Sequence, residues 1–300
     1  MFSRRHPFLF FTMIIAAIPA VALVLTVAIL VGGSALFSSS MSSGFKQDKG
    51  NIGVVEIVGV IASSKEVSRQ IKLFRDDPAI KAIVLRIDSP GGGVGPSQEI
   101  YREIIKAKEV KKVIASLGSV AASGGYYAAS AADAIVANPG TITGSIGVIM
   151  EYANFQKIME KIGLTPVVIK SGEFKDMGSP VREITPKEME ILQGVADEVH
   201  LQFVRDVAAG RSLEQKLVEK LADGRIYTGE KALELNLVDR LGNLEDALEW
   251  GAEMADIKGK AVPVYPKEKR LGILKELVST LFKQAYISGA VTDYFRYVLN

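Results

Sequence analysis

Residues 81–93 read "KAIVLRIDSPGGG", an apolar run that ends in Pro90 and three glycines. A short, nearly continuous apolar run closed by turn residues is typical of a strand that is buried on both faces. Two further runs share the pattern, "IGVVEIVGVI" at 52–61 and "KKVIASL" at 111–117. These three segments therefore predict neighbouring strands of one sheet.

The segments between these strands have helical periodicity. They are "SKEVSRQIKLFRDD" at 64–77 and "PSQEIYREIIKAKEV" at 96–110. Buried strands that alternate with helices predict an α/β fold with a mainly parallel sheet. In such folds, sites lie beyond the carboxyl ends of the strands. Two glycine-rich segments fall there, "DSPGGG" at 88–93 and "GSVAASGG" at 118–125.

The rest of the chain predicts a domain over residues 52–260 and a separate tail. Residues 164–172 resemble another strand, residues 185–210 a long helix that Gly210 closes, and residues 243–257 a final helix. The tail, 261–300, has an amphipathic helical period from Leu271. A partner subunit, the domain itself or a membrane surface could each cover its apolar face.

The N-terminal residues predict a membrane anchor. Residues 8–31 carry no charge and would span about 36 Å as a helix, enough for a bilayer core of about 30 Å. The preceding "SRRH" favours an N-terminus in the cytoplasm and a domain outside it. We therefore expect a cytoplasmic terminus and one transmembrane helix at 1–37 and a flexible spacer at 38–51. A cleaved signal peptide is the alternative.

Composition excludes several kinds of chemistry. A net charge of +2 gives no sign of a nucleic-acid partner, and the absence of cysteine removes disulfides and thiolates. There are two histidines, His6 before the anchor and His200 inside the long predicted helix. A Ser-His-Asp triad and a multi-histidine zinc centre are therefore disfavoured, and we expect no metal or cofactor.

Ser123 is a candidate nucleophile. It lies among small residues at a predicted strand-to-helix turn, which could project its hydroxyl and leave the next backbone N–H open to an oxyanion. The glycines of "DSPGGG" could supply a second donor, although a plain turn or a phosphate cradle is the alternative. Without a histidine, a lysine of lowered pKa could serve as base. Lys175, in the glycine-flanked loop "IKSGEFKDMGSP", has a suitable setting, and an ordinary exposed lysine is the alternative.

Four ordered motifs resemble a known family. They are "LRIDSPGGGV", "GSVAASGGYYAASAAD", "TGSIGVI" and "SGEFKDMGSP", and together they are similar to the short, single-repeat form of signal peptide peptidase A. The resemblance covers roughly Ile52 to Ile257 and implies a Clp-protease/crotonase-like fold with repeated β-β-α units. It also implies catalytic roles: Ser123 is the nucleophile, Lys175 the general base and Ser145 the hydroxyl that holds the lysine, with Gly92 and Gly124 as oxyanion donors.

The resemblance further implies an assembly and a substrate. The serine and lysine that meet come from neighbouring repeats or subunits, so we expect a ring-shaped homo-oligomer. The expected function is a serine endopeptidase in a bacterial or archaeal cell membrane, which degrades remnant signal peptides outside the cytoplasm. The alternatives are a catalytically silent membrane scaffold and a crotonase-type acyl-CoA enzyme, which would need neither an anchor nor Ser123 together with Lys175.

Overall fold

The structure is a computed structural model that describes residues 50–266. Residue contacts separate Met1–Asp48 from a second unit, Lys49–Asn300, and everything below belongs to the second unit. The predicted anchor, most of the predicted spacer and the amphipathic helix from Leu271 lie outside the described residues. Within residues 50–266, none of the helices has the length and apolar composition needed to cross a bilayer.

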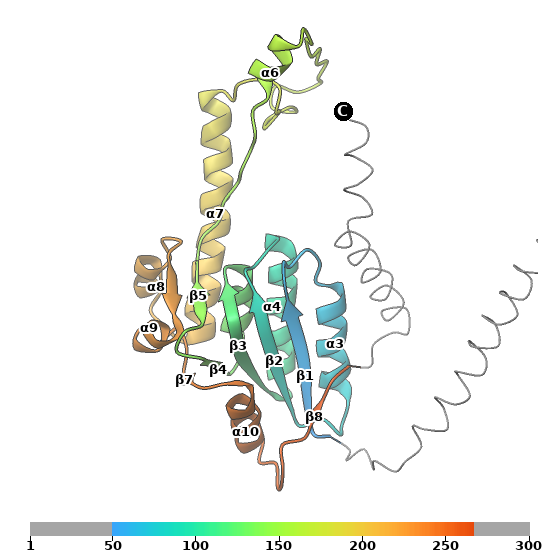
Figure 1. Ribbon diagram of the computed structural model, residues 1–300, viewed down its shortest axis with the longest axis vertical. Coiled ribbons are helices and arrows are strands. Elements are labelled where there is room, and N and C mark those ends of the chain that lie inside the picture. Colours follow the sequence, from blue (N-terminus) through green and yellow to red (C-terminus); the bar gives the residue numbers. More distant parts are fainter. Residues whose placement is uncertain (1–49, 267–300) are drawn as a thin grey trace, which may run out of the picture. The chain divides into compact units, whose positions relative to one another are not determined.

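Three parallel strands form the centre of the sheet, as the apolar runs predict (Figure 1). They are β1 (Ile52–Val58), β2 (Ala82–Ser89) and β3 (Lys112–Ala122). The strand order is β6-β5-β3-β2-β1-β8, with β4 and β7 off this path. Because β1, β2 and β3 run in one direction, the turns that follow them meet at the same edge of the sheet.

Helices cover both faces of the sheet. On one face, α3 (Lys65–Asp76), α4 (Val94–Lys108) and α5 (Gly124–Ser130) share a core with strand residues such as Val55 and Leu85. On the other, α10 (Leu244–Met254) packs on Val54, Val84 and Ile114. Successive strand residues point to opposite faces, which explains why the runs are apolar throughout.

Strand β3 is longer than its apolar run predicts. Its first half pairs with β4 (Ala134–Ala137), and its second half, Val120–Ala122, pairs with β5 (Ile142–Gly144). The small residues after Leu117 are therefore a strand and not a loop, because β5 supplies a hydrogen-bonding partner for them. As a result, Ser123 stands directly at the end of a paired strand.

The remaining elements extend the sheet. In chain order they are α7 (Pro186–Arg211), α8 (Gln215–Leu221), β6 (Ile226–Thr228), α9 (Gly229–Glu234), β7 (Arg240–Leu241) and β8 (Pro263–Val264). Helix α7 starts with a reciprocal capping box between Thr185 and Glu188. It does not end at Gly210 but at Arg211, where Ser212 takes a left-handed φ of 54°. A methyl group at Gly210 would lie 2.1 Å from the carbonyl oxygen of Ser130, so this glycine permits close packing on α5.

Residues 147–185, which we call the arm, connect β5 to α7. The arm holds one short helix, α6 (Gln156–Lys161). The strand predicted at 164–172 is wrong: residues 164–170 have no regular structure, because no other strand of the described chain pairs with them. Val167 and Ile169 are 85% and 97% exposed, and Ile149 is 88% exposed. The arm therefore presents several large apolar side chains to solvent.

Candidate active site

Ser123 lies in the turn between β3 and α5, where its backbone is held in an unusual conformation. Its φ is 51° and its ψ −121°, a combination that is strained for a residue with a side chain. The strain is maintained from both sides: the Ser123 N–H donates to the Gly144 carbonyl at 2.8 Å, and the Tyr127 N–H donates to the Ser123 carbonyl at 2.8 Å. The hydroxyl makes no capping hydrogen bond with α5. This side chain is half-buried and faces a small pocket.

The glycine turn after β2 packs directly against Ser123. A methyl group at Gly91 would lie 2.6 Å from the Gly124 nitrogen and 2.8 Å from Cβ of Ser123, so only glycine allows this approach. Gly91 also has a φ of 99°, which glycine adopts readily. The buried Ser89 hydroxyl fixes the turn, because it donates to the Gly59 carbonyl and accepts from the Gly91 N–H.

Gly92 and Gly124 lie together beside Ser123. The nitrogen of Gly92 is 3.3 Å from the position that a methyl group at Gly124 would take. Ile61 bonds to the Gly91 carbonyl and the Gly93 N–H, on either side of Gly92. Gly124 is the first residue of α5, where backbone N–H groups have no acceptor within the helix. Both N–H groups are therefore placed near Ser123, and their action as oxyanion donors stays a prediction.

Ser145 is the neighbour of Ser123 on the adjacent strand. Ala122 pairs with Gly144, so the two serines follow directly opposed residues of parallel strands that are about 4.8 Å apart. Ser145 also has a φ of 51°, and its N–H donates to the Arg225 carbonyl at 2.8 Å. The structure thus brings Ser145 and Ser123 together, although the role of Ser145 stays a prediction.

Lys175 is not beside Ser123 within one chain. It is exposed in a turn of the arm, and this turn is bonded to residues before the first turn of α7 through Arg182. The Ser123 pocket, in contrast, meets α7 at Val199 and Phe203. The span from Glu188 to Val199 alone corresponds to about 16 Å of helix at about 1.5 Å per residue. Among the described residues, no hydrogen bond or shared pocket links Lys175 to Ser123.

The pocket next to Ser123 is small and mostly apolar. Its volume is about 30 Å³, and it is lined by Val94, Tyr127, Val148, Val199 and Phe203 together with the glycines and Ser97. The Tyr127 and Phe203 rings pack with centroids 4.6 Å apart. Burial raises the pKa of the Tyr127 hydroxyl, and its hydrogen bond to the Asp206 carboxylate adds to the effect. Tyr127 therefore stays neutral and forms a wall of the pocket.

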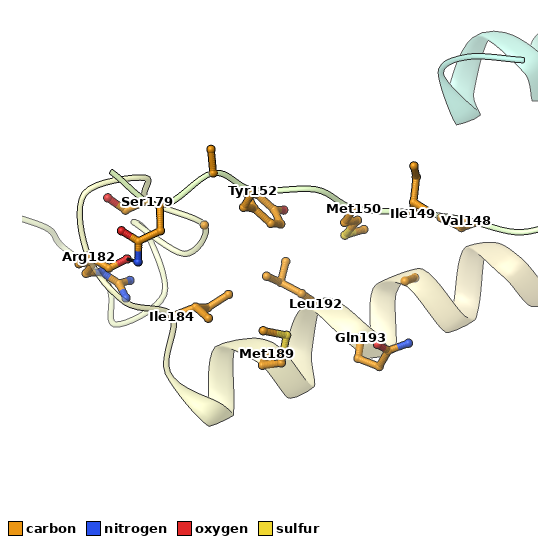
Figure 2. A pocket seen from close by; sticks show the side chains of 14 residues that line it. Val148, Ile149, Met150, Tyr152, Ser179, Arg182, Ile184, Met189, Leu192 and Gln193 are labelled. Carbon is orange, nitrogen blue, oxygen red and sulfur yellow. Dashed lines mark hydrogen bonds between the residues drawn. The ribbon is translucent and has the colours of Figure 1, made fainter. Parts of the chain in front are cut away.

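A larger pocket of about 480 Å³ lies between the arm and the first half of α7 (Figure 2). Tyr152 points from the extended arm segment toward Leu192 of the helix, and Arg182 lies at one end. Val148 lines both this pocket and the one beside Ser123. The sequence does not indicate this pocket, because it forms between residues far apart in the chain.

A cluster of ion pairs near Lys175 is also missed by sequence reasoning. Arg182 donates from Nε to Asp176 at 2.8 Å, and its terminal nitrogens bond to the Glu188 carboxylate. Lys170 donates to the other Asp176 oxygen at 2.6 Å. The available signal is the Thr185–Glu188 capping pattern, which marks where α7 starts but not which cation Glu188 binds.

Comparisons with known proteins agree with the four motifs. The sequence model of peptidase family S49 matches residues 105–258. A candidate protease of Synechocystis is 49% identical over 208 residues, 69% of this chain and 75% of that protein. A candidate signal peptide peptidase of Enterococcus faecium, named SppA, is 41% identical over 181 residues, 60% of this chain and 53% of that protein.

A solved structure supports the fold. The membrane-bound stomatin-specific protease 1510-N superposes with a TM-score of 0.50 at 18% identity, over 73% of this chain and 99% of its own. At that identity the likeness concerns the fold alone, and the mixed α/β sheet with helices on both faces fits the Clp-protease-like fold. From the matched family model and the relatives, the chain belongs to peptidase family S49, the family of signal peptide peptidase A.

Proposed function

We propose that this S49 peptidase is a membrane-anchored serine endopeptidase with a Ser-Lys dyad, which degrades remnant signal peptides outside the cytoplasm. Residues 8–31 would form the anchor. The observation that carries the proposal is the strained backbone of Ser123 at the end of β3, packed against a turn of glycines. Such a turn exposes a serine hydroxyl next to backbone N–H groups, and this is what acyl transfer needs.

The proposed reaction has two steps. The Ser123 oxygen attacks the peptide carbonyl carbon while the amine of Lys175 takes the hydroxyl proton, and the Gly92 and Gly124 N–H groups stabilise the resulting oxyanion. Collapse breaks the C–N bond, and the lysine ammonium gives its proton to the leaving amine. Water then attacks the acyl-enzyme, with Lys175 again accepting a proton, and this releases the acid and regenerates Ser123.

The lysine in this scheme comes from a second copy of the chain. Two observations support this arrangement. Lys175 lies far along α7 from the Ser123 pocket of its own chain, and the arm that carries it exposes Ile149, Val167 and Ile169 almost fully. Apolar surface of this kind on a single subunit is typical of a protein interface. A closed ring of copies would cover it and would supply each Ser123 with a neighbour's Lys175.

Labelling with a fluorophosphonate probe tests the proposed nucleophile. We expect the native full-length protein to form one covalent adduct, which peptide mass spectrometry assigns to Ser123, and heat-denatured protein to form none. Ser119→Ala, which removes a serine on the same strand, serves as the matched control and should label normally. Folded protein that neither labels nor hydrolyses peptides would instead support the silent scaffold.

Ser145→Ala is expected to lower kcat by about tenfold, less than the loss of either dyad residue. The Ser145 hydroxyl would accept one hydrogen bond from the lysine amine, and water can partly replace it. Because this bond affects how readily the amine loses its proton, the rise of kcat with pH should also move. The measurement is kcat against pH with a quenched fluorogenic peptide. Full activity with an unaltered profile would remove Ser145 from the site.

A further inference from the structure

The turn that carries Lys175 is fastened by a single arginine. Arg182 donates from Nε to the Asp176 carboxylate at 2.8 Å and from a terminal nitrogen to the Asp176 backbone carbonyl at 3.1 Å. The same guanidinium bonds to the Glu188 carboxylate, whose side chain is 4% exposed. Arg182 thus joins the residue after Lys175 to the capping box of α7. The position of the amine follows from these bonds.

The charges around this turn balance one another. Apart from Lys175, six charged side chains from the arm and from α7 take part in its ion pairs. The cations are Lys170, Arg182 and Lys187, and the anions are Glu173, Asp176 and Glu188. Each anion contacts at least one cation. Removal of Arg182 would leave this set with one excess negative charge.

An excess negative charge matters for a lysine that must act as a base. Hydrogen bonds from Arg182 and then from Lys170 hold the pKa of Asp176 well below its usual range, so Asp176 is ionised throughout any useful assay range. Consecutive Cα atoms are about 3.8 Å apart, which keeps the carboxylate close to the neighbouring lysine. A carboxylate without a partner favours the protonated ammonium, which cannot accept a proton.

We propose that Arg182 is a positioning residue for the amine of Lys175: it holds the turn in place and cancels the charge of Asp176, so that the amine can lose its proton. This inference rests on the proposed role of Lys175 as general base. It assigns to the arm a second task beyond contact between copies, namely to set the pH range in which the peptidase works.

The test is kcat against pH for full-length variants with a quenched fluorogenic peptide. For Arg182→Gln we expect a lower kcat and a rising limb displaced by about 0.5–1 pH unit toward higher pH. Arg182→Lys should restore most of the displacement, because it keeps the charge. The matched control is Arg69→Gln, which removes an arginine from an exposed ion pair of α3 and should leave the profile unchanged.

A double variant separates charge from anchoring. Asp176→Asn with Arg182→Gln removes one anion and one cation, so the rising limb should return to within about 0.2 pH unit of the wild type while kcat stays low. A purely structural arginine predicts no displacement in either variant, and that result would overturn the inference. If Arg182→Gln does not fold, Lys170→Met removes the other cation on Asp176 and should displace the limb in the same direction.

Lys175→Ala distinguishes the two possible failures. If this variant keeps its activity, the proposed base is wrong and the inference about Arg182 fails with it. If Lys175→Ala is inactive while the limb of Arg182→Gln stays in place, the dyad survives and the inference alone is wrong.

Discussion

Ser123→Ala and Lys175→Ala are each expected to lower kcat by at least about a thousandfold, and the double variant should be scarcely worse than either. The reason is that nucleophile and base act as one unit: a serine without its base is a poor nucleophile, and a base without its serine has no proton to accept. The residual rate would come from substrate binding and the two oxyanion donors. The measurement is kcat for the three full-length variants with a quenched fluorogenic peptide.

Thermal unfolding supplies the control for these variants. Ser123 is half-buried, and Lys175 lies exposed in a turn, so neither change opens a cavity in the core. We therefore expect unfolding midpoints close to that of the wild type. Lys161→Ala, which removes an exposed lysine at the end of α6 in the same arm, should keep full activity. Losses that multiply in the double variant would mean that Lys175 acts in another step.

Features set by neighbouring residues are predictable from the sequence. The parallel sheet follows from apolar runs that alternate with helices, and the start of α7 follows from Thr185, Pro186 and Glu188. The glycine turn beside Ser123 is visible as well, because few residues other than glycine allow the close approach seen at Gly91. In each case the physical cause lies within a few residues of its effect.

Features set by distant partners are not predictable in this way. Residues 118–122 look like a loop, but they form a strand because β5 pairs with them. Residues 164–170 look like a strand, but no other strand of the described chain pairs with them. The apolar pattern is the same kind of signal in both places, and only the presence of a hydrogen-bonding neighbour decides the outcome.

The candidate site divides along the same line. Ser123 and its glycines are marked by local composition, whereas Ser145 and Lys175 are identified through the family resemblance. The structure brings Ser145 to Ser123 because their strands pair. It leaves Lys175 elsewhere, since nothing in the described chain holds the arm against the Ser123 pocket. A residue that meets its partner only in another copy leaves no trace in the contacts of a single chain.

Mixed oligomers of Ser123→Ala and Lys175→Ala protein are therefore expected to regain activity that neither variant has alone. In a closed ring, each site would combine Ser123 of one copy with Lys175 of the next. A site is intact when a Lys175→Ala copy supplies the serine and a Ser123→Ala copy supplies the lysine. With random assembly at equal amounts, about one quarter of the sites meet this condition. Activity should rise from zero to that level after dissociation and reassembly.

The dependence on composition makes the result specific. Activity should be greatest at equal amounts and fall toward zero at either extreme, because an intact site needs one copy of each kind. Two affinity tags, one on each variant, show by sequential purification that mixed oligomers have formed. Simple mixing without dissociation is the control and should recover nothing while exchange is slow. If both residues of each site came from the same copy, every site would lack one partner at every ratio, so mixed oligomers without activity would refute the shared site.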